Sequence, residues 1–305
     1  MRFDQAVAKS LKRFSRNQLK GWIKSGNLTL DYNKVQPKTK IIEGQIINLD
    51  VSLEPVVAVV PEDIPLDIVH EDSDFFIINK PNGLVIHPGA GNRSGTLQNG
   101  LLYLDPSQAI LPRAGIVHRL DKGTSGLLVV ARNSASYLNL ISQMKQKTVT
   151  KIYFGICNDI PISGGKIDLP IGRSSRDRLK MSVSRNGKPA TTSYKVLERY
   201  RAHSLLEIQI ETGRTHQIRV HLSHKKYPLL GDPLYGGRPR LPTSPSEELK
   251  ESISKLKRQA LHSSCLSFLH PSSGKRVVFK SSLPKDIQDM LSILARDKKF
   301  SLNEN

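Results

Sequence analysis

Apolar residues at helical spacing open the chain and predict two helices followed by two short strands. The apolar helical positions are Val7, Leu11 and Phe14 in the first helix and Leu19, Trp22 and Ile23 in the second. Ser15 followed by Gln18 is typical of a helix start, and Gly26 suits the end of the second helix. Apolar runs at 28–30 and 46–51, with polar turn residues between them, predict the strands. Together these elements form a small α/β module.

The composition of the chain divides it into two domains. A Pro-punctuated stretch at 55–65 predicts a linker between the module at 1–54 and a larger domain at 66–295. Residues 296–305 are polar and predict a flexible tail. The length of 305 residues agrees with two domains, because roughly 150 residues per domain is typical.

Strand and helix patterns are mixed in the larger domain. Apolar runs at 75–79, 126–131, 152–156 and 204–211 predict strands, and a helical pattern covers 135–147. A doubly wound parallel sheet would show a regular alternation of strands and helices, which is absent here. The pattern therefore favours the α+β class.

The net charge of the chain and its distribution predict a polyanionic partner. The chain carries 46 Lys and Arg against 27 Asp and Glu, a net charge of +19. Residues 111–232 hold 21 of the basic and 8 of the acidic side chains, whereas 61–110 hold 2 and 7. Such concentration is typical of a phosphate-binding surface, although charge alone leaves DNA, RNA and acidic lipid open.

Several classes of protein are excluded by what the sequence lacks. No apolar run reaches the roughly 18–20 residues of a membrane span, and Met1 to Ser10 has no secretory pattern, so we expect a cytoplasmic protein. Two distant cysteines exclude a disulfide scaffold. His216, His221 and His224 match no common zinc spacing, so we predict no metal. The P-loop pattern G-x-x-x-x-G-K-[ST] is absent, and no G-x-G-x-x-G opens a helix, so we predict no nucleotide cofactor.

The segment G-I-V-H-R-L-D-K-G-T-S-G, at 115–126, contains the sharpest candidate for catalysis. Asp121 lies between Arg119 and Lys122, and neighbouring cations favour an ionised carboxylate. A positioned carboxylate can act as a nucleophile towards carbon. The alternative is that Asp121 only caps a turn towards Thr124, and composition by itself favours that alternative.

Two further clusters contain polar residues suited to binding a nucleic acid. In the segment 211–221, Gly213 predicts a strand-to-helix corner and Thr215 a helix start, and Arg214, His216 and Arg219 either bind phosphate or cap the helix. In K-I-Y, at 151–153, Tyr153 either packs in the core or stacks on an unpaired base.

The second helix of the small module carries a basic row. Arg16, Lys20 and Lys24 recur at i, i+4 and i+8, so they share one side of the helix. Such a row is often a solvated face, but this one lacks alternating acidic partners. We therefore predict that it contacts phosphate.

The motifs in combination resemble the RluA-type pseudouridine synthases, with a module similar to the S4 RNA-binding domain before them. The resemblance extends from Asp4 to about Leu294 and includes H-R-L-D-x-x-T-S-G, K-x-Y, T-G-R-x-H-Q-I-R-V-H and G-D-P-x-Y-G in family order. Upstream H-P-G-A-G-N and downstream Y-G-G-R-P-R are similar to the branch that acts on the helix 69 stem-loop of 23S rRNA. The sequence departs at Gly123, where the nearest relatives often have an acidic residue.

This resemblance implies a reaction, a fold and a set of site residues. Uracil is detached from ribose, rotated and rejoined through C5, without metal or cofactor, on a mixed and largely antiparallel sheet. The implied roles are nucleophile for Asp121, ion-pair partner for Arg219, stacking residue for Tyr153, occupant of the vacated stack for Arg119 and apolar contact for Leu261. Base flipping follows, because a stacked nucleotide hides its glycosidic bond.

Alternatives to this function stay open at the level of sequence. The chain is a synthase whose substrate is free 23S rRNA or a large-subunit precursor, or it is a non-catalytic rRNA-binding or ribosome-assembly protein. A third alternative is a family member that acts on tRNA or another rRNA site. We expect a monomer. The carboxylate of Asp121 either attacks the anomeric carbon or assists deprotonation at its neighbour.

Overall fold

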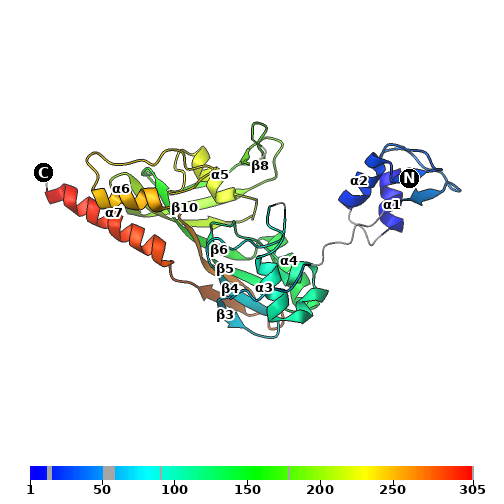
Figure 1. The fold of residues 1–305 in the computed structure, drawn as a ribbon, viewed down its shortest axis with the longest axis horizontal. Coiled ribbons are helices and arrows are strands. Elements are labelled where there is room, and N and C mark those ends of the chain that lie inside the picture. Colours follow the sequence, from blue (N-terminus) through cyan, green and yellow to red (C-terminus); the bar gives the residue numbers. More distant parts are fainter. Residues whose placement is uncertain (12–15, 51–58, 90, 178, 304–305) are drawn as a thin grey trace. The chain divides into compact units, whose positions relative to one another are not determined.

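The computed structural model describes residues 1–11, 16–50, 59–89, 91–177 and 179–303 (Figure 1). The chain forms two compact units, Met1–Ala58 and Val59–Asn305. No helix among the described residues is long and apolar enough to span a membrane.

The first unit contains two helices and one small sheet. Helices α1 (Phe3–Ser10) and α2 (Arg16–Ser25) pack on the antiparallel pair β1 (Leu28–Leu30) and β2 (Ile47–Leu49). The core residues are Phe3, Val7, Leu19, Ile23, Leu28 and Leu30. Gly26 ends α2 at φ +92°, as its position predicted. The predicted cap Ser15 and core residue Phe14 lie outside the described residues.

The second unit is built on a nine-stranded mixed sheet, which confirms the predicted α+β class. The strand order is β3-β4-β5-β12-β6-β11-β10-β7, with β13 beside β12, and every pairing except β5 with β12 is antiparallel. The strands are β3 (Ile68–Glu71), β4 (Phe75–Lys80), β5 (Ser125–Ala131), β6 (Thr150–Asn158), β7 (Gly165–Asp168), β10 (Thr191–Arg199), β11 (His203–Ile210), β12 (Leu261–Leu269) and β13 (Arg276–Lys280). Strands β8 (Ile171–Arg173) and β9 (Met181–Val183) form a separate pair.

Helices cover the central strands, which explains why these strands are apolar without alternation. The helices are α3 (Leu97–Leu104), α4 (Ser134–Gln146), α5 (Gln217–His224), α6 (Glu247–Lys255) and α7 (Lys285–Asn303), with 3-10 turns η1 (Pro106–Ile110) and η2 (Pro112–Gly115). In β4, Phe76 and Ile78 pack in one core with α3 and α5, and Phe75 and Ile77 pack in another with Leu140 of α4. Both faces of the strand are therefore buried.

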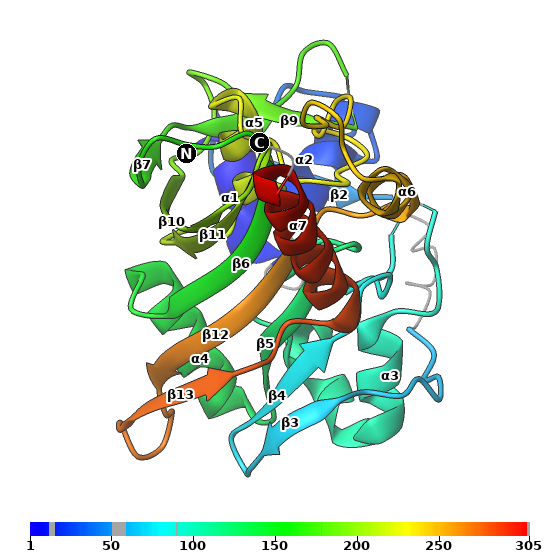
Figure 2. The same ribbon diagram turned by 90° about the vertical axis from the view of Figure 1, so that its left-hand side faces the viewer.

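Two predicted boundaries of the second unit were wrong where tertiary packing outweighs local composition. Residues 55–58 of the predicted linker lie outside the described residues, but Val59 packs on the core, and the Asn99 side chain donates to the Val60 carbonyl at 2.7 Å. The predicted flexible tail is helical to Asn303, because buried Asp297 accepts hydrogen bonds from Arg201 and from the Ser246 amide. Figure 2 shows α7 lying along the sheet, where its apolar residues pack against β6 and β11.

Candidate active site

The loop that carries Asp121 ends in a tight junction with β5. The Thr124 amide donates to the Asp121 carbonyl at 3.0 Å, which forms a turn through the backbone and leaves the carboxylate out of it. Gly126 follows at φ +109°, and a β-carbon there would lie 2.3 Å from the Ser263 carbonyl oxygen. Only glycine fits this junction between β5 and β12. The Asp121 carboxylate therefore does not act as the turn cap that composition favoured.

An ion-pair chain fixes the Asp121 carboxylate. Arg219, on α5, donates from Nη1 to Asp121 Oδ2 at 3.1 Å. Its Nε and Nη2 donate to the two oxygens of Asp232 at 2.7 and 2.8 Å. The Asp232 side chain has no exposed area, whereas that of Asp121 is 16% exposed. Buried Asp232 therefore anchors Arg219, and Arg219 in turn holds the partly exposed carboxylate of Asp121.

Burial and charge have opposite effects on Arg219. Burial disfavours the guanidinium ion, but the hydrogen bonds and charges of Asp232, and then of Asp121, outweigh it and raise the pKa of Arg219. The guanidinium also lies 5.0 Å from the ring centre of Tyr235. The Tyr235 hydroxyl shares a 2.8 Å hydrogen bond with His216 Nδ1. Burial lowers the pKa of His216, which favours a neutral ring.

The site residues proposed from the sequence meet around one small cavity of about 50 Å³. They are Arg119, Asp121, Tyr153, Arg214, His216, Arg219 and Leu261. Tyr153 and Leu261 are buried, and burial raises the pKa of the Tyr153 phenol above its ordinary value. Lys20 and Lys24 are exposed on α2 in the other unit, and the side chain of Arg16 lies outside the described part.

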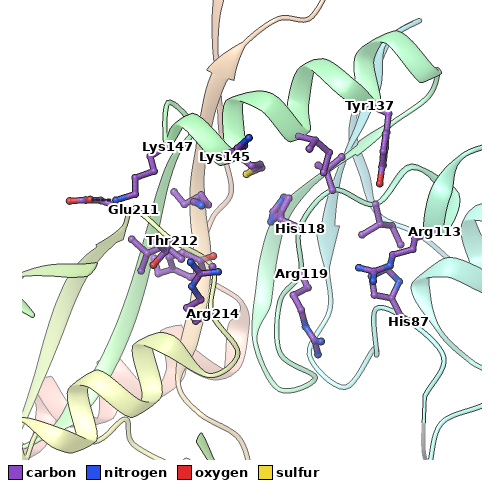
Figure 3. A pocket seen from close by; sticks show the side chains of 18 residues that line it. His87, Arg113, His118, Arg119, Tyr137, Lys145, Lys147, Glu211, Thr212 and Arg214 are labelled. Atoms are coloured by element: carbon purple, nitrogen blue, oxygen red, sulfur yellow. Dashed lines mark hydrogen bonds and ion pairs between the residues drawn. The ribbon is translucent and has the colours of Figure 1, made fainter. Parts of the chain in front are cut away.

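A larger cavity of about 490 Å³ adjoins the small one and shares Arg119, Tyr153 and Arg214 with it. In the view of Figure 3, His118 lies between Lys147, Glu211 and Arg214 on one side and His87 and Arg113 on the other. Six of the side chains around this cavity are Lys or Arg, and a single one, Glu211, is acidic. The arrangement suits a polyanion that passes over the Asp121 carboxylate.

The start of α5 differs from the prediction. The helix begins at Gln217 after His216, which has φ +56°, and not at Thr215. The Gln217 side chain accepts from Thr212 Oγ1 and from the Arg214 amide and donates to the Thr191 carbonyl. These bonds hold residues 212–216 as an ordered loop, so the helix starts later.

One cluster has the composition of a cation site that sequence reasoning missed. Ligand atoms of Asp72, Asp74 and His270 lie within 4.8 Å of one another. Asp72 accepts from the Phe75 amide, and Asp74 accepts from the hydroxyl of Ser136. The carboxylates thus have donors already, and hydrogen bonds account for their arrangement. Both ring nitrogens of His221 also have hydrogen-bond partners, the Thr192 hydroxyl and the Leu169 carbonyl.

Other residues that support the site were also missed. Asp232 entered the sequence analysis only as part of the G-D-P-x-Y-G motif, and in the structure it accepts from the amides of Leu234 and Tyr235. Arg258 donates to the Gly123 carbonyl at 3.2 Å, and Gln259 donates to Thr124 at 3.0 Å. Both residues precede β12 and hold the turn after Asp121. The signal available in the sequence for Asp232 was the G-D-P-x-Y-G motif.

Lys80 fixes the same loop from the other side. It is fully buried, and its Nζ donates to the carbonyls of Pro81, Leu84 and Lys122 at 2.7, 3.0 and 3.2 Å. Burial, and then the charge of Arg258, lower its pKa to about 7. Three carbonyl acceptors match the three donors of the protonated amine. Lys80 therefore ties residue 122 to the end of β4.

Lys80→Met is expected to reduce both stability and catalysis. Three carbonyls lose this donor, and those of Pro81 and Leu84 have no other among the described residues, so we expect the free energy of unfolding to fall by about 2–4 kcal/mol. The loop of Asp121 loses an anchor, so kcat falls as well. Chemical denaturation and initial rates measure the two effects, and Lys275→Met, which changes an exposed lysine in the turn between β12 and β13, is the matched control. Unchanged stability and kcat would refute this role.

Comparison with known proteins places these observations in a family. Residues 74–224 match the RNA pseudouridylate synthase family. The chain is 46% identical over 97% of its length to 89% of the ribosomal large subunit pseudouridine synthase D of Xanthomonas campestris, and 43% identical over 97% of its length to 91% of that of Escherichia coli. The solved human RNA pseudouridylate synthase domain containing 4 is 29% identical, with a TM-score of 0.58 over 75% of this chain and 92% of that one. The chain belongs to the RluA family of RNA pseudouridine synthases.

Proposed function

We propose that this synthase converts uridine to pseudouridine in 23S rRNA of the large ribosomal subunit, in the helix 69 stem-loop. The observation that carries the proposal is the Asp121–Arg219–Asp232 chain beside a basic cavity. The relatives are named for the large ribosomal subunit, and the two flanking motifs of the sequence favour the helix 69 branch.

The reaction is an isomerisation, and its atoms balance within the substrate. The bond between N1 and the anomeric carbon breaks, a bond from C5 to that carbon forms, C5 loses a proton and N1 gains one. The Asp121 carboxylate either attacks the anomeric carbon or removes a proton from the neighbouring carbon. Both routes need a carboxylate held in place, which is what Arg219 supplies. The substrate is neither oxidised nor reduced, and the proposal includes no cofactor and no metal.

The other residues around the small cavity receive roles from their positions. Tyr153 stacks on the flipped base as a neutral phenol, because burial raises its pKa. Buried Leu261 packs against the base, and exposed Arg119 fills the vacated stack. Arg214 and His216, at the shared wall, bind RNA beside the target.

The first unit is proposed to act as an S4-like RNA-binding domain in a monomeric, cytoplasmic enzyme. We expect Lys20→Ala with Lys24→Ala to weaken rRNA binding and to lower its salt slope by about 1–2, because each lost phosphate contact removes about 0.7–0.9. Filter binding from 50 to 300 mM salt measures the slope. A control, Lys34→Ala with Lys38→Ala, removes equal exposed charge from the loop before β2. An unchanged slope would exclude α2 from the RNA-binding surface.

A panel of RNAs tests the substrate class against the alternatives. Unmodified 23S rRNA, large-subunit precursor, 16S rRNA and tRNA transcripts are incubated with enzyme, and nucleosides are separated by chromatography. The proposal predicts pseudouridine in the large-subunit samples only. Product in tRNA alone would move the target, and no product in any sample, despite tight rRNA binding, would support a non-catalytic role.

A further inference from the structure

Lys151 is a buried cation that the proposed mechanism does not use. The residue is 5% exposed and lies on β6, two positions before Tyr153. Among the described residues, no carboxylate or hydrogen-bond acceptor pairs with its Nζ. Burying an unpaired ammonium ion costs free energy, so an anionic partner from outside the chain would be favoured.

His118 supplies a second donor beside Lys151. The Val129 amide donates to His118 Nε2 at 3.0 Å, which places the ring proton on Nδ1. Burial, and then the charge of Lys151, lower the pKa of His118 to about 3, so the ring stays neutral. A neutral imidazole with its proton on Nδ1 adds a hydrogen-bond donor without adding further repulsion.

Both residues line the cavity of about 490 Å³, whose other charged groups are mostly cationic. These groups are Arg113, Arg119, Lys145, Lys147, Arg214 and the single carboxylate Glu211. Glu211 is neutralised by Lys147 at 3.3 Å and by Lys166 at 3.5 Å. The potential of the cavity wall is therefore positive around Lys151.

We propose that Lys151 and His118 form a binding site for one phosphodiester group of the substrate RNA, next to the target nucleotide. Residues two apart on a strand share a face and lie roughly 7 Å from each other, so the Lys151 site adjoins the base-stacking Tyr153. A neutral base oxygen could accept a hydrogen bond there, but only an anion also offsets the buried charge. The inference rests on the proposed RNA substrate.

Lys151→Met tests the site because methionine has a similar shape and no charge. RNA affinity is expected to fall by about 10- to 100-fold, as for loss of a hydrogen bond between charged groups. The salt slope of binding is expected to fall by about 0.7, for one phosphate of a single strand. Tm stays equal or rises, because the variant no longer buries an unpaired charge. Lys151→Arg keeps the charge and should keep most of the slope.

The binding measurements do not depend on catalysis, which separates this inference from the proposed function. Lys250→Met is the matched control: it removes one lysine from the exposed side of α6, where Lys250 pairs with Glu247 at 2.6 Å. Weaker binding with an unchanged salt slope, or a Tm several degrees lower, would overturn the phosphate site in favour of a structural role. Absence of pseudouridine formation by the wild-type enzyme would contradict the proposed function and leave the binding result to be judged alone.

Discussion

Asp121→Asn is expected to abolish pseudouridine formation, with a loss of at least about 10⁴-fold in kcat, a magnitude seen when a catalytic nucleophile is removed. An amide has nearly the same shape as a carboxylate and still accepts a hydrogen bond from Arg219, so folding and RNA affinity stay close to those of the wild type. It cannot attack carbon or remove a proton at a useful rate. Single-turnover rates with saturating rRNA measure the chemical step directly.

The control for this variant is Asp63→Asn, which changes an exposed carboxylate in the same unit. It should keep wild-type rates. If Asp121→Asn kept a tenth or more of the wild-type rate, Asp121 would not be the reacting group.

The second large effect is expected for Arg219→Met. The substitution leaves the buried Asp232 carboxylate without its cation, so the free energy of unfolding falls by about 3–5 kcal/mol. It also frees the Asp121 carboxylate to move, and a displacement of about 1 Å can cost roughly 100-fold in rate. Denaturant titration and single-turnover kinetics measure the two losses.

A double variant separates these two losses. Arg219→Met with Asp232→Asn removes both charges, and the asparagine oxygen still accepts from the amides of Leu234 and Tyr235. Stability should return most of the way to that of the wild type, while kcat stays low. Recovery of kcat together with stability would mean that Arg219 serves the fold and does not orient Asp121.

Local patterns predicted about half of the helices and strands found in the described residues, but not their order in space. The apolar run of β4 and the cap at Gly26 follow from residues close together in the chain. The placement of β12 between β5 and β6 depends on pairing across more than 100 residues, for example between Leu261 and Gly155. The linker prediction failed for the same reason, since Val59 packs on residues far along the chain.

In the candidate site too, the sequence suggested individual residues, and their partners depend on contacts between distant segments. Asp121 and Arg219 are 98 residues apart, and no periodicity joins them; the motif resemblance suggested the pair, which the structure places at 3.1 Å. Asp232 lies in a family motif, but its bonds to the Tyr235 amide and to Arg219 depend on what packs against that turn. Lys80 and Lys151 lie just outside the predicted strands at 75–79 and 152–156, and only the structure shows that they are buried and which acceptors Lys80 has.

Mapping of pseudouridine in 23S rRNA examines the rRNA target and the role of Asp121 in one experiment. Unmodified rRNA is incubated with the wild-type enzyme or with Asp121→Asn, treated with carbodiimide and copied by reverse transcriptase. We expect stops in the helix 69 loop with the wild type only. Stops at other positions would contradict the target, and equal stops with both proteins would contradict the role of Asp121.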